Sequence, residues 1–180
     1  ELADSWATDG HKWLNVGYDC GLAFVRDLAD LRRTFAATAG YLPASDRFEA
    51  MHHTPQSSQR ARQVEVWAVL RTLGRRGVAE LVQRSCAAAR TIADALAAGG
   101  LTVLNDVVLN QVLVRLVDGP TTEALVAAVQ ADGWVWCGPA VWEGTAAMRV
   151  SVSSWKTGPD EAAEAARVIL ECAARVRPAP

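Results

Sequence analysis

The second half of the chain alternates between short runs with a two-residue hydrophobic period and longer runs with a helical period. Residues 112–117 and 148–153 place apolar side chains at every second position, which predicts two strands with one wetter face. Between these strands, Thr121 is expected to cap a helix. After them, Thr157 with Asp160 three residues on predicts a capping box before a last helix. The pattern therefore predicts a small α+β domain with helices on one sheet face.

The first half of the chain is less regular. Residues 21–26 form a short apolar run typical of a buried strand, and residues 31–38 show the spacing of a short helix. Two prolines and three serines interrupt any period across residues 40–58, which predicts a long mobile loop. Helical periodicity then covers residues 64–98, with a pause at residues 74–77, where two glycines flank two arginines.

Gly99 and Gly100 predict the end of this helix, and β-branched residues become frequent after them. We therefore expect a domain boundary here, with residues 1–99 in one domain and residues 100–180 in the next. Four tryptophans in the second domain are interpreted as core or interface aromatics; they are Trp134, Trp136, Trp142 and Trp155.

Composition narrows the class of protein and its partners. Of 180 residues, 51% are hydrophobic and 21% are charged, which is typical of a folded chain with a sizeable core. The formal net charge is −2, and the arginines are not interleaved with aromatics, so we expect no nucleic-acid partner. No apolar run approaches the ~18 residues that cross a bilayer, so we expect no membrane span.

The cysteines and histidines argue against a metal site. The four cysteines lie far apart, without a CxxC pair or a histidine at zinc-site spacing, and the adjacent His52 and His53 point apart. We therefore expect free, buried thiols and a reducing, cytoplasmic location. The cysteines are Cys20, Cys86, Cys137 and Cys172.

Candidate chemistry lies near the start, where Lys12 stands between His11 and Trp13. An ordinary lysine stays protonated, whereas one beside apolar and ring-bearing neighbours can lose its proton and attack a carbonyl carbon. Lys12 is therefore a candidate for carrying an aldehyde cofactor. Taken alone, a solvated surface cation is the alternative interpretation.

The run Asp9-Gly10-His11-Lys12-Trp13-Leu14-Asn15, followed by Tyr18-Asp19-Cys20-Gly21 and an apolar strand, resembles the cofactor-lysine segment of the group II pyridoxal-phosphate decarboxylases. This family includes the aromatic amino acid and glutamate decarboxylases. The resemblance implies an α/β fold, namely the end of a type I pyridoxal-phosphate transferase large domain followed by a small α+β domain. It also implies pyridoxal 5'-phosphate as cofactor, an amino acid substrate and a homodimer. Further cofactor contacts of the family precede this segment, so we expect the chain to be a C-terminal portion that needs the N-terminal half of the fold.

The resemblance also implies roles for single residues. Lys12 is expected to form the Schiff base with the cofactor, His11 to contact its phosphate region, and Asp9 to accept a hydrogen bond from His11. Tyr41 lies at the position of the loop tyrosine that protonates Cα after decarboxylation, a role suited to a phenol that is protonated at neutral pH. Ser58 stands at the arginine-rich helix start that reaches the phosphate of the neighbouring subunit.

Three functions stay open on the sequence. The first is amino acid decarboxylation with Lys12 and Tyr41. The second is an aminotransferase or an aldehyde-forming relative, which shares Lys12 but treats Cα differently. The third is a non-catalytic remnant of the fold. Two positions also depart from the family pattern, since Gln59 stands where several relatives have arginine and Gly17 where many have proline.

Overall fold

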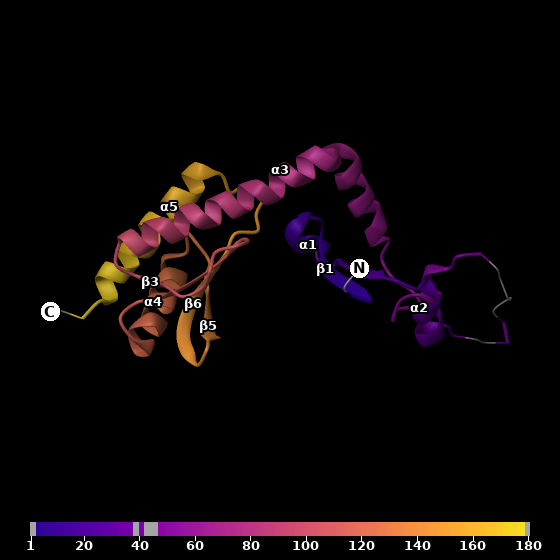
Figure 1. The fold of residues 1–180 in the computed structure, drawn as a ribbon, viewed down its shortest axis with the longest axis horizontal. Coiled ribbons are helices and arrows are strands. Elements are labelled where there is room, and N and C mark those ends of the chain that lie inside the picture. Colours follow the sequence, from indigo (N-terminus) through magenta and orange to yellow (C-terminus); the bar gives the residue numbers. More distant parts are fainter. Residues whose placement is uncertain (1–2, 38–39, 42–46, 179–180) are drawn as a thin grey trace. The chain divides into compact units, whose positions relative to one another are not determined.

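Two units of mixed helix and sheet make up the chain, and they divide between Thr72 and Leu73. The computed structural model describes residues 3–37, 40–41 and 47–178 (Figure 1). We call the parts before and after the division the N-terminal unit and the C-terminal unit. The division expected at residue 99 does not coincide with this one, because helix residues 88–96 pack into the core of the C-terminal unit.

The N-terminal unit is built on a pair of antiparallel strands. Strand β1 (Ser5–Asp9) pairs with β2 (Gly21–Val25), and the short helix α1 (Gly10–Trp13) lies in the connection between them. Helix α2 (Leu28–Phe35) and a 3-10 turn, η1 (Ala50–His52), follow. The elements of the C-terminal unit come after these, beginning with the second part of the long helix α3.

The strand and helix expected in this region are present with shifted bounds. The strand predicted at residues 21–26 is confirmed as β2, but it is largely exposed rather than buried. Helix α2 begins three residues before the predicted range, because the Asp27 side chain accepts a 2.9 Å hydrogen bond from the backbone N–H of Ala29 and caps it there. Of the predicted mobile loop, residues 42–46 lie outside the described residues, and the described part includes η1.

Helix α3 (Arg62–Ala98) contains the break that the glycines predicted. Gly74 has φ 62° and ψ −176°, a non-helical conformation that glycine adopts without a Cβ clash. Before the break, Val64, Trp67 and Leu70 are exposed. After it, one face of the helix is buried, and its largest members are Leu81, Ile92 and Leu96.

The C-terminal unit holds a four-stranded antiparallel sheet in the order β3-β4-β6-β5. Its strands are β3 (Thr102–Val103), β4 (Gln111–Arg115), β5 (Gly138–Trp142) and β6 (Thr145–Ser151). The strands predicted from alternation are confirmed as β4 and β6, which are direct neighbours in the sheet. Strands β3 and β5 were not predicted, because the first is two residues long and the second begins with Gly138-Pro139.

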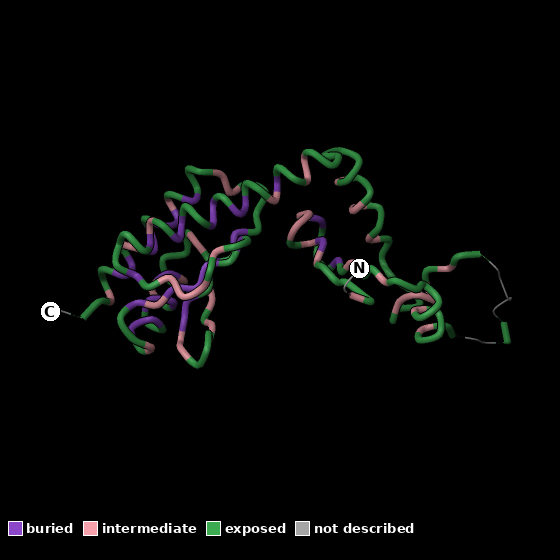
Figure 2. Tube along the Cα trace, viewed as in Figure 1, coloured by how far each residue is buried: buried purple, intermediate pink, exposed green. Residues whose placement is uncertain are grey.

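Helices α4 (Gly119–Asp132) and α5 (Pro159–Val176) complete this unit and bury the sheet's apolar face together with the second part of α3. Val112 and Val150 face one another across β4 and β6 and are buried with helix residues in one core. Figure 2 shows buried residues gathered along these elements, with exposed residues on their outer sides.

Both predicted helix caps differ from the observed ones. Helix α4 is capped by Asp118, whose side chain accepts a 2.8 Å hydrogen bond from the N–H of Thr121, so Thr121 lies inside the helix. Helix α5 begins after Gly158, whose N–H donates to Glu161 at 2.9 Å, one residue later than the predicted box. The spacing of three residues was right, and its starting point was not.

The aromatic and sulfur side chains differ in burial. The four tryptophans interpreted as core or interface aromatics are exposed in this chain, with Trp136 exposed by 75%, so they are not core residues of it. The four cysteines are free and buried, as predicted. Within the described residues, no helix combines the length and apolarity that a membrane span requires.

Candidate active site

Lys12 lies on helix α1, in the connection that joins the two paired strands β1 and β2. Asp9, the last residue of β1, pairs with Gly21, the first of β2, so that residues 10–20 form the connection. The N–H of Gly10 donates to the carbonyl of Cys20 at 2.8 Å. A Cβ on Gly10 would lie 3.2 Å from the Cys20 sulfur and 3.3 Å from Val16 Cγ2. The close approach of Gly10 therefore fixes the start of α1 against the end of the connection.

Lys12 is held by its neighbours through both its side chain and its backbone. Its Nζ donates to Asp9 Oδ2 at 2.5 Å, and its backbone carbonyl accepts from Asn15 Nδ2 at 2.8 Å. The side chain is 63% exposed, so the amine is open to a molecule from solution. The hydrogen bond from Lys12 lowers the pKa of the Asp9 carboxyl. Asp9 therefore accepts from Lys12, one turn away, and not from His11 as expected.

His11 is fixed by the backbone of Cys20 and the ring of Tyr18. Its Nδ1 lies 3.1 Å from both the backbone nitrogen and the carbonyl oxygen of Cys20, so either tautomer is held by one residue. The Tyr18 ring meets the imidazole edge to face at a centroid distance of 4.5 Å. When Nδ1 accepts the Cys20 N–H, the ring proton is on Nε2, which then becomes a donor.

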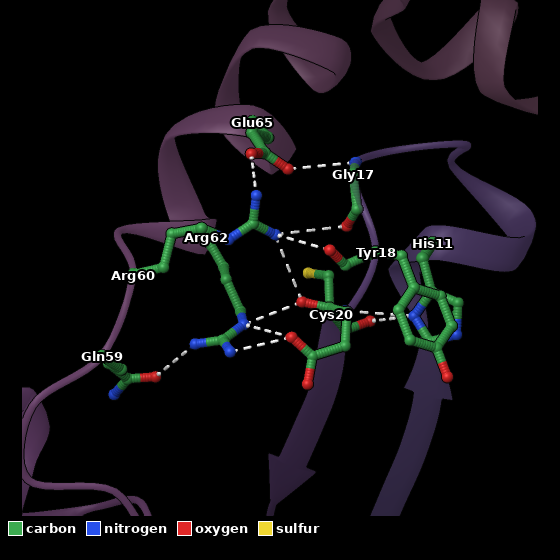
Figure 3. A network of polar contacts seen from close by, with 9 residues as sticks. His11, Gly17, Tyr18, Cys20, Gln59, Arg60, Arg62 and Glu65 are labelled. Carbon is green, nitrogen blue, oxygen red and sulfur yellow. Dashed lines mark hydrogen bonds and ion pairs between the residues drawn. The ribbon is translucent and has the colours of Figure 1, made fainter.

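Two arginines from the start of α3 hold the connection from outside (Figure 3). Arg60 Nη2 lies 3.4 Å from the carbonyl oxygens of three successive residues, Gly17, Tyr18 and Asp19. Its Nη1 donates to Glu65 at 2.6 Å, and Glu65 accepts in turn from the Gly17 N–H at 3.0 Å. The guanidinium therefore contacts the connection through Nη2 and Glu65 of α3 through Nη1.

Arg62 binds both the backbone and the side chain of Asp19. Its Nε donates to the Asp19 carbonyl at 2.7 Å, and its Nη2 donates to the Asp19 carboxylate at 2.8 Å. The hydrogen bond from Arg62 to the carboxylate lowers the pKa of the Asp19 carboxyl. Sequence reasoning placed this segment near a phosphate and missed its contacts with residues 17–19. Charges 43 residues apart in a chain carry no periodic signal, so only the fold reveals the pair.

Gly17 also gains a structural account. A proline at this position would lack the N–H that donates to Glu65. A Cβ on Gly17 would lie 2.8 Å from Glu65 Oε2 and 3.3 Å from Arg60 Nη1. Glycine therefore suits a connection whose backbone is approached closely by the side chains of the next helix.

The remaining predicted site residues lie on exposed segments. The side chain of Tyr41 is 85% exposed, and its following residue lies outside the described part of the chain. Ser58 is exposed in the coil before α3. Within the described ranges, no group of three or more His, Cys, Asp or Glu residues is arranged to hold a metal ion.

Comparison with known proteins identifies the wider family. The model of the pyridoxal-dependent decarboxylase conserved domain matches residues 1–117, well over half of the chain. The chain is 30% identical over 166 residues to histidine decarboxylase of Drosophila melanogaster, covering 89% of this chain and 20% of that protein. It is 32% identical over 90 residues to 3,4-dihydroxyphenylacetaldehyde synthase of Aedes aegypti, covering 46% of this chain and 17% of that protein.

A solved structure shares the fold at lower identity. The crystal structure of Oryza sativa TDC with PLP and tryptamine superposes with a TM-score of 0.86 and 19% identity, covering 96% of this chain and 39% of that one. The expected mixture of helix and sheet therefore agrees with that of a known decarboxylase fold. The chain spans about a fifth of the length of the two curated relatives above. On the match over residues 1–117, it belongs to the pyridoxal-dependent decarboxylase family.

Proposed function

We propose that this chain is part of a pyridoxal-phosphate-dependent amino acid decarboxylase in which Lys12 bonds the cofactor through its side-chain nitrogen. The observation that carries the proposal is the placement of Lys12. It is an exposed amine on a fixed turn, with a carboxylate at 2.5 Å and a histidine beside it, inside the segment that the family model matches. The intact enzyme is expected to be a cytoplasmic homodimer.

The side chains present fit the chemistry of this cofactor. An amine is the group that bonds an aldehyde, and Asp9 accepts the hydrogen bond that aims Lys12 Nζ. His11, held through Nδ1, presents Nε2 as a donor that suits a phosphate. When bound, the cofactor supplies an electron-accepting ring that stabilises the charge left on Cα after the carboxylate departs.

Tyr41 is proposed to donate the proton that Cα takes up. A phenol is protonated at neutral pH and needs only to come within hydrogen-bond reach of the carbon. Its high exposure leaves the hydroxyl available to a substrate. Ser58, in the coil before α3, is proposed as a phosphate contact of the neighbouring subunit.

The assignment of Lys12 is tested by reducing the intact enzyme with borohydride in the presence of pyridoxal phosphate and mapping the labelled peptide. The chain has two lysines, so Lys156, which lies over the Trp155 ring, is the internal control. We expect the label on Lys12 in the wild type and in Lys156→Gln, and none in Lys12→Ala. A label on Lys156, or on a lysine elsewhere in the enzyme, would contradict the proposal.

An aldehyde-forming reaction is the second candidate, favoured by the match with the Aedes aegypti aldehyde synthase. The Tyr41→Phe variant separates the two reactions when histidine and tryptophan are offered as substrates. Removing a general acid costs roughly 10²- to 10⁴-fold in rate, so we expect amine formation to fall by that order. With dissolved oxygen as the oxidant, which is reduced to hydrogen peroxide, aldehyde and ammonia should then exceed amine. A variant that makes amine at the wild-type rate would remove Tyr41 from the mechanism.

A further inference from the structure

The polar network at the start of α3 contains more hydrogen bonds than a single surface ion pair. We propose that Arg60 and Arg62 are positioning residues that set the geometry of His11 and Lys12 by clamping residues 17–19. This inference rests on the proposed role of Lys12 as the cofactor lysine. We call Arg60, Arg62, Asp19 and Glu65, with the backbone they bind, the arginine clamp.

The arginine clamp holds residues 17–19 from one side. Three carbonyls of one turn point at Arg60, so rotation of any of these peptides would break a contact. Arg62 holds both the backbone and the side chain of the last of them, Asp19. The backbone of residues 17–19 is therefore fixed from one side, by a helix that begins more than 40 residues later.

Contacts through His11 and the start of α1 link the clamped turn to Lys12. Residue 18 supplies the ring that packs on His11, and residue 20 supplies the backbone groups that hold His11 Nδ1. Cys20 also accepts from the N–H of Gly10, the first residue of α1. The groups that orient His11 and the start of α1 thus lie within or next to the clamped turn. Lys12 follows His11 on the same turn of helix.

The charges around the two arginines do not suit an anion site. Their two positive charges are matched by the carboxylates of Asp19 and Glu65, which lie at 2.8 and 2.6 Å. The donors of Arg60 are directed at carbonyls and at Glu65, which leaves the cluster neutral overall. A neutral cluster with directed donors serves geometry rather than ligand charge, and the planar fork of arginine suits it better than lysine.

Arg62 is also more buried than a surface arginine of the same helix. Its side chain is 22% exposed, whereas that of Arg76 is 93% exposed and lies 3.6 Å from Glu80. Arg76 is therefore the matched control: it has the same charge and lies on the same helix, and it has no part in the clamp.

The test uses the intact enzyme with Arg62→Gln, Asp19→Asn, the double variant and Arg76→Gln. The first readout is the rate at which added pyridoxal phosphate is captured covalently, followed by visible absorbance and stopped with borohydride. A misplacement of about 1 Å can cost on the order of 100-fold, so we expect capture to slow by about 10- to 100-fold. Reversible affinity for the cofactor should fall by a smaller factor than the capture rate, because the clamp acts on reversible binding through His11, whereas it acts on capture through both His11 and Lys12.

The second readout is independent of the cofactor. Hydrogen exchange of the peptide spanning residues 10–20 is measured in the cofactor-free enzyme, where both single variants should exchange faster than the wild type. The double variant should be no worse than Arg62→Gln alone, because the Asp19 carboxylate acts in the clamp through Arg62. Arg62→Lys, which keeps the charge but not the fork, should recover part of the capture rate, and Arg76→Gln should match the wild type.

The outcomes separate this inference from the proposed function. Wild-type capture and wild-type exchange in a folded Arg62→Gln enzyme would overturn the clamp. Should Arg62→Gln fail to fold, the exposed Asp19→Asn and the Arg62→Lys variants decide, and wild-type behaviour in both would overturn it equally. A borohydride label away from Lys12, with faster exchange at residues 10–20, would refute the cofactor lysine and leave the clamp as a structural device.

Discussion

Different forces stabilise the interior of each of the two units of this chain. In the C-terminal unit, valine, leucine, isoleucine and alanine side chains from the sheet and from three helices share one buried core. In the described part of the N-terminal unit, the buried residues are Gly10, Val16 and Cys20. Hydrogen bonds and ion pairs carry the contacts between its distant segments, chiefly through the arginine clamp.

This difference separates a scaffold from a site. Burial is non-directional, and a packed core resists change mainly through lost contacts and cavities. Hydrogen bonds to fixed donors are directional and specify orientation at a modest net gain in stability. The unit that bears Lys12 uses the directional kind. We therefore expect substitutions in the C-terminal unit to change stability most, and substitutions in the clamp to change geometry.

The largest expected effect comes from the C-terminal core. Leu96 is fully buried on α3, whereas Leu70 on the same helix is 45% exposed. Leu96→Ala should lower the free energy of unfolding by about 2 to 5 kcal/mol, because it leaves a cavity that the neighbours fill only in part. Leu70→Ala is the control and should cost less than about 1 kcal/mol. Urea unfolding of the chain measures both, and equal losses would refute the contrast between the two halves of α3.

The C-terminal unit was the easier one to predict, for a physical reason. Its strands and helices have an apolar face, and burial imposes a period of two or 3.6 residues on the sequence. The unpredicted elements are those with little periodic content, such as β3 with two residues. The caps were misplaced by one to three residues, because Asp118 and Gly158 compete with nearby threonines for the same position.

The site was predictable by motif and not by periodicity. The ordered string around Lys12 pointed to the family, which the match over residues 1–117 bears out. The clamp escaped prediction, because nothing in the spacing of Asp19 and Arg62 says that they meet. Asp9 shows the same limit on a smaller scale: it was expected to accept a hydrogen bond from His11, and in the geometry of α1 it accepts from Lys12 instead.

Two equally buried thiols give a smaller and more local test of the comparison. Cys20 in the N-terminal unit and Cys137 in the C-terminal unit are each 1% exposed. Burial also raises the pKa of the Cys137 thiol to about 11, so its attack requires the unit to open. We expect Cys20 to be alkylated faster, because its unit opens at a lower free energy.

The measurement is the native-state alkylation rate of each cysteine by peptide mass spectrometry, divided by its rate in urea-unfolded chain. Leu96→Ala should speed the labelling of Cys137 more than that of Cys20. Slower labelling of Cys20 than of Cys137 would mean that the polar network protects Cys20 at least as well as the apolar core protects Cys137. The expected difference in stability between the two units would then be refuted.

The smallest expected effect is a dependence on pH, with one carboxylate in each unit. Hydrogen bonds from Arg62 lower the pKa of Asp19, and hydrogen bonds from Thr121 lower the pKa of Asp118, in both cases from an ordinary value of 3.8. A carboxyl whose pKa is lowered by folding stabilises the fold above its unfolded pKa. That contribution is lost as the pH falls from 3.8 through the lowered folded value.

Asparagine variants remove the titration and keep the shape. Asp118→Asn still caps α4, so it should flatten the loss of stability between pH 5 and pH 3 while changing little at pH 5. Asp19→Asn should instead lose part of the clamp at pH 5, because a neutral amide bonds Arg62 more weakly than a carboxylate does. Urea midpoints at the two pH values measure the first effect, and hydrogen exchange of residues 10–20 at pH 5 measures the second. If Asp19→Asn changed neither exchange nor its pH dependence, the carboxylate would be incidental, and the orientation of the lysine segment would rest on the contacts of the two arginines with backbone carbonyls.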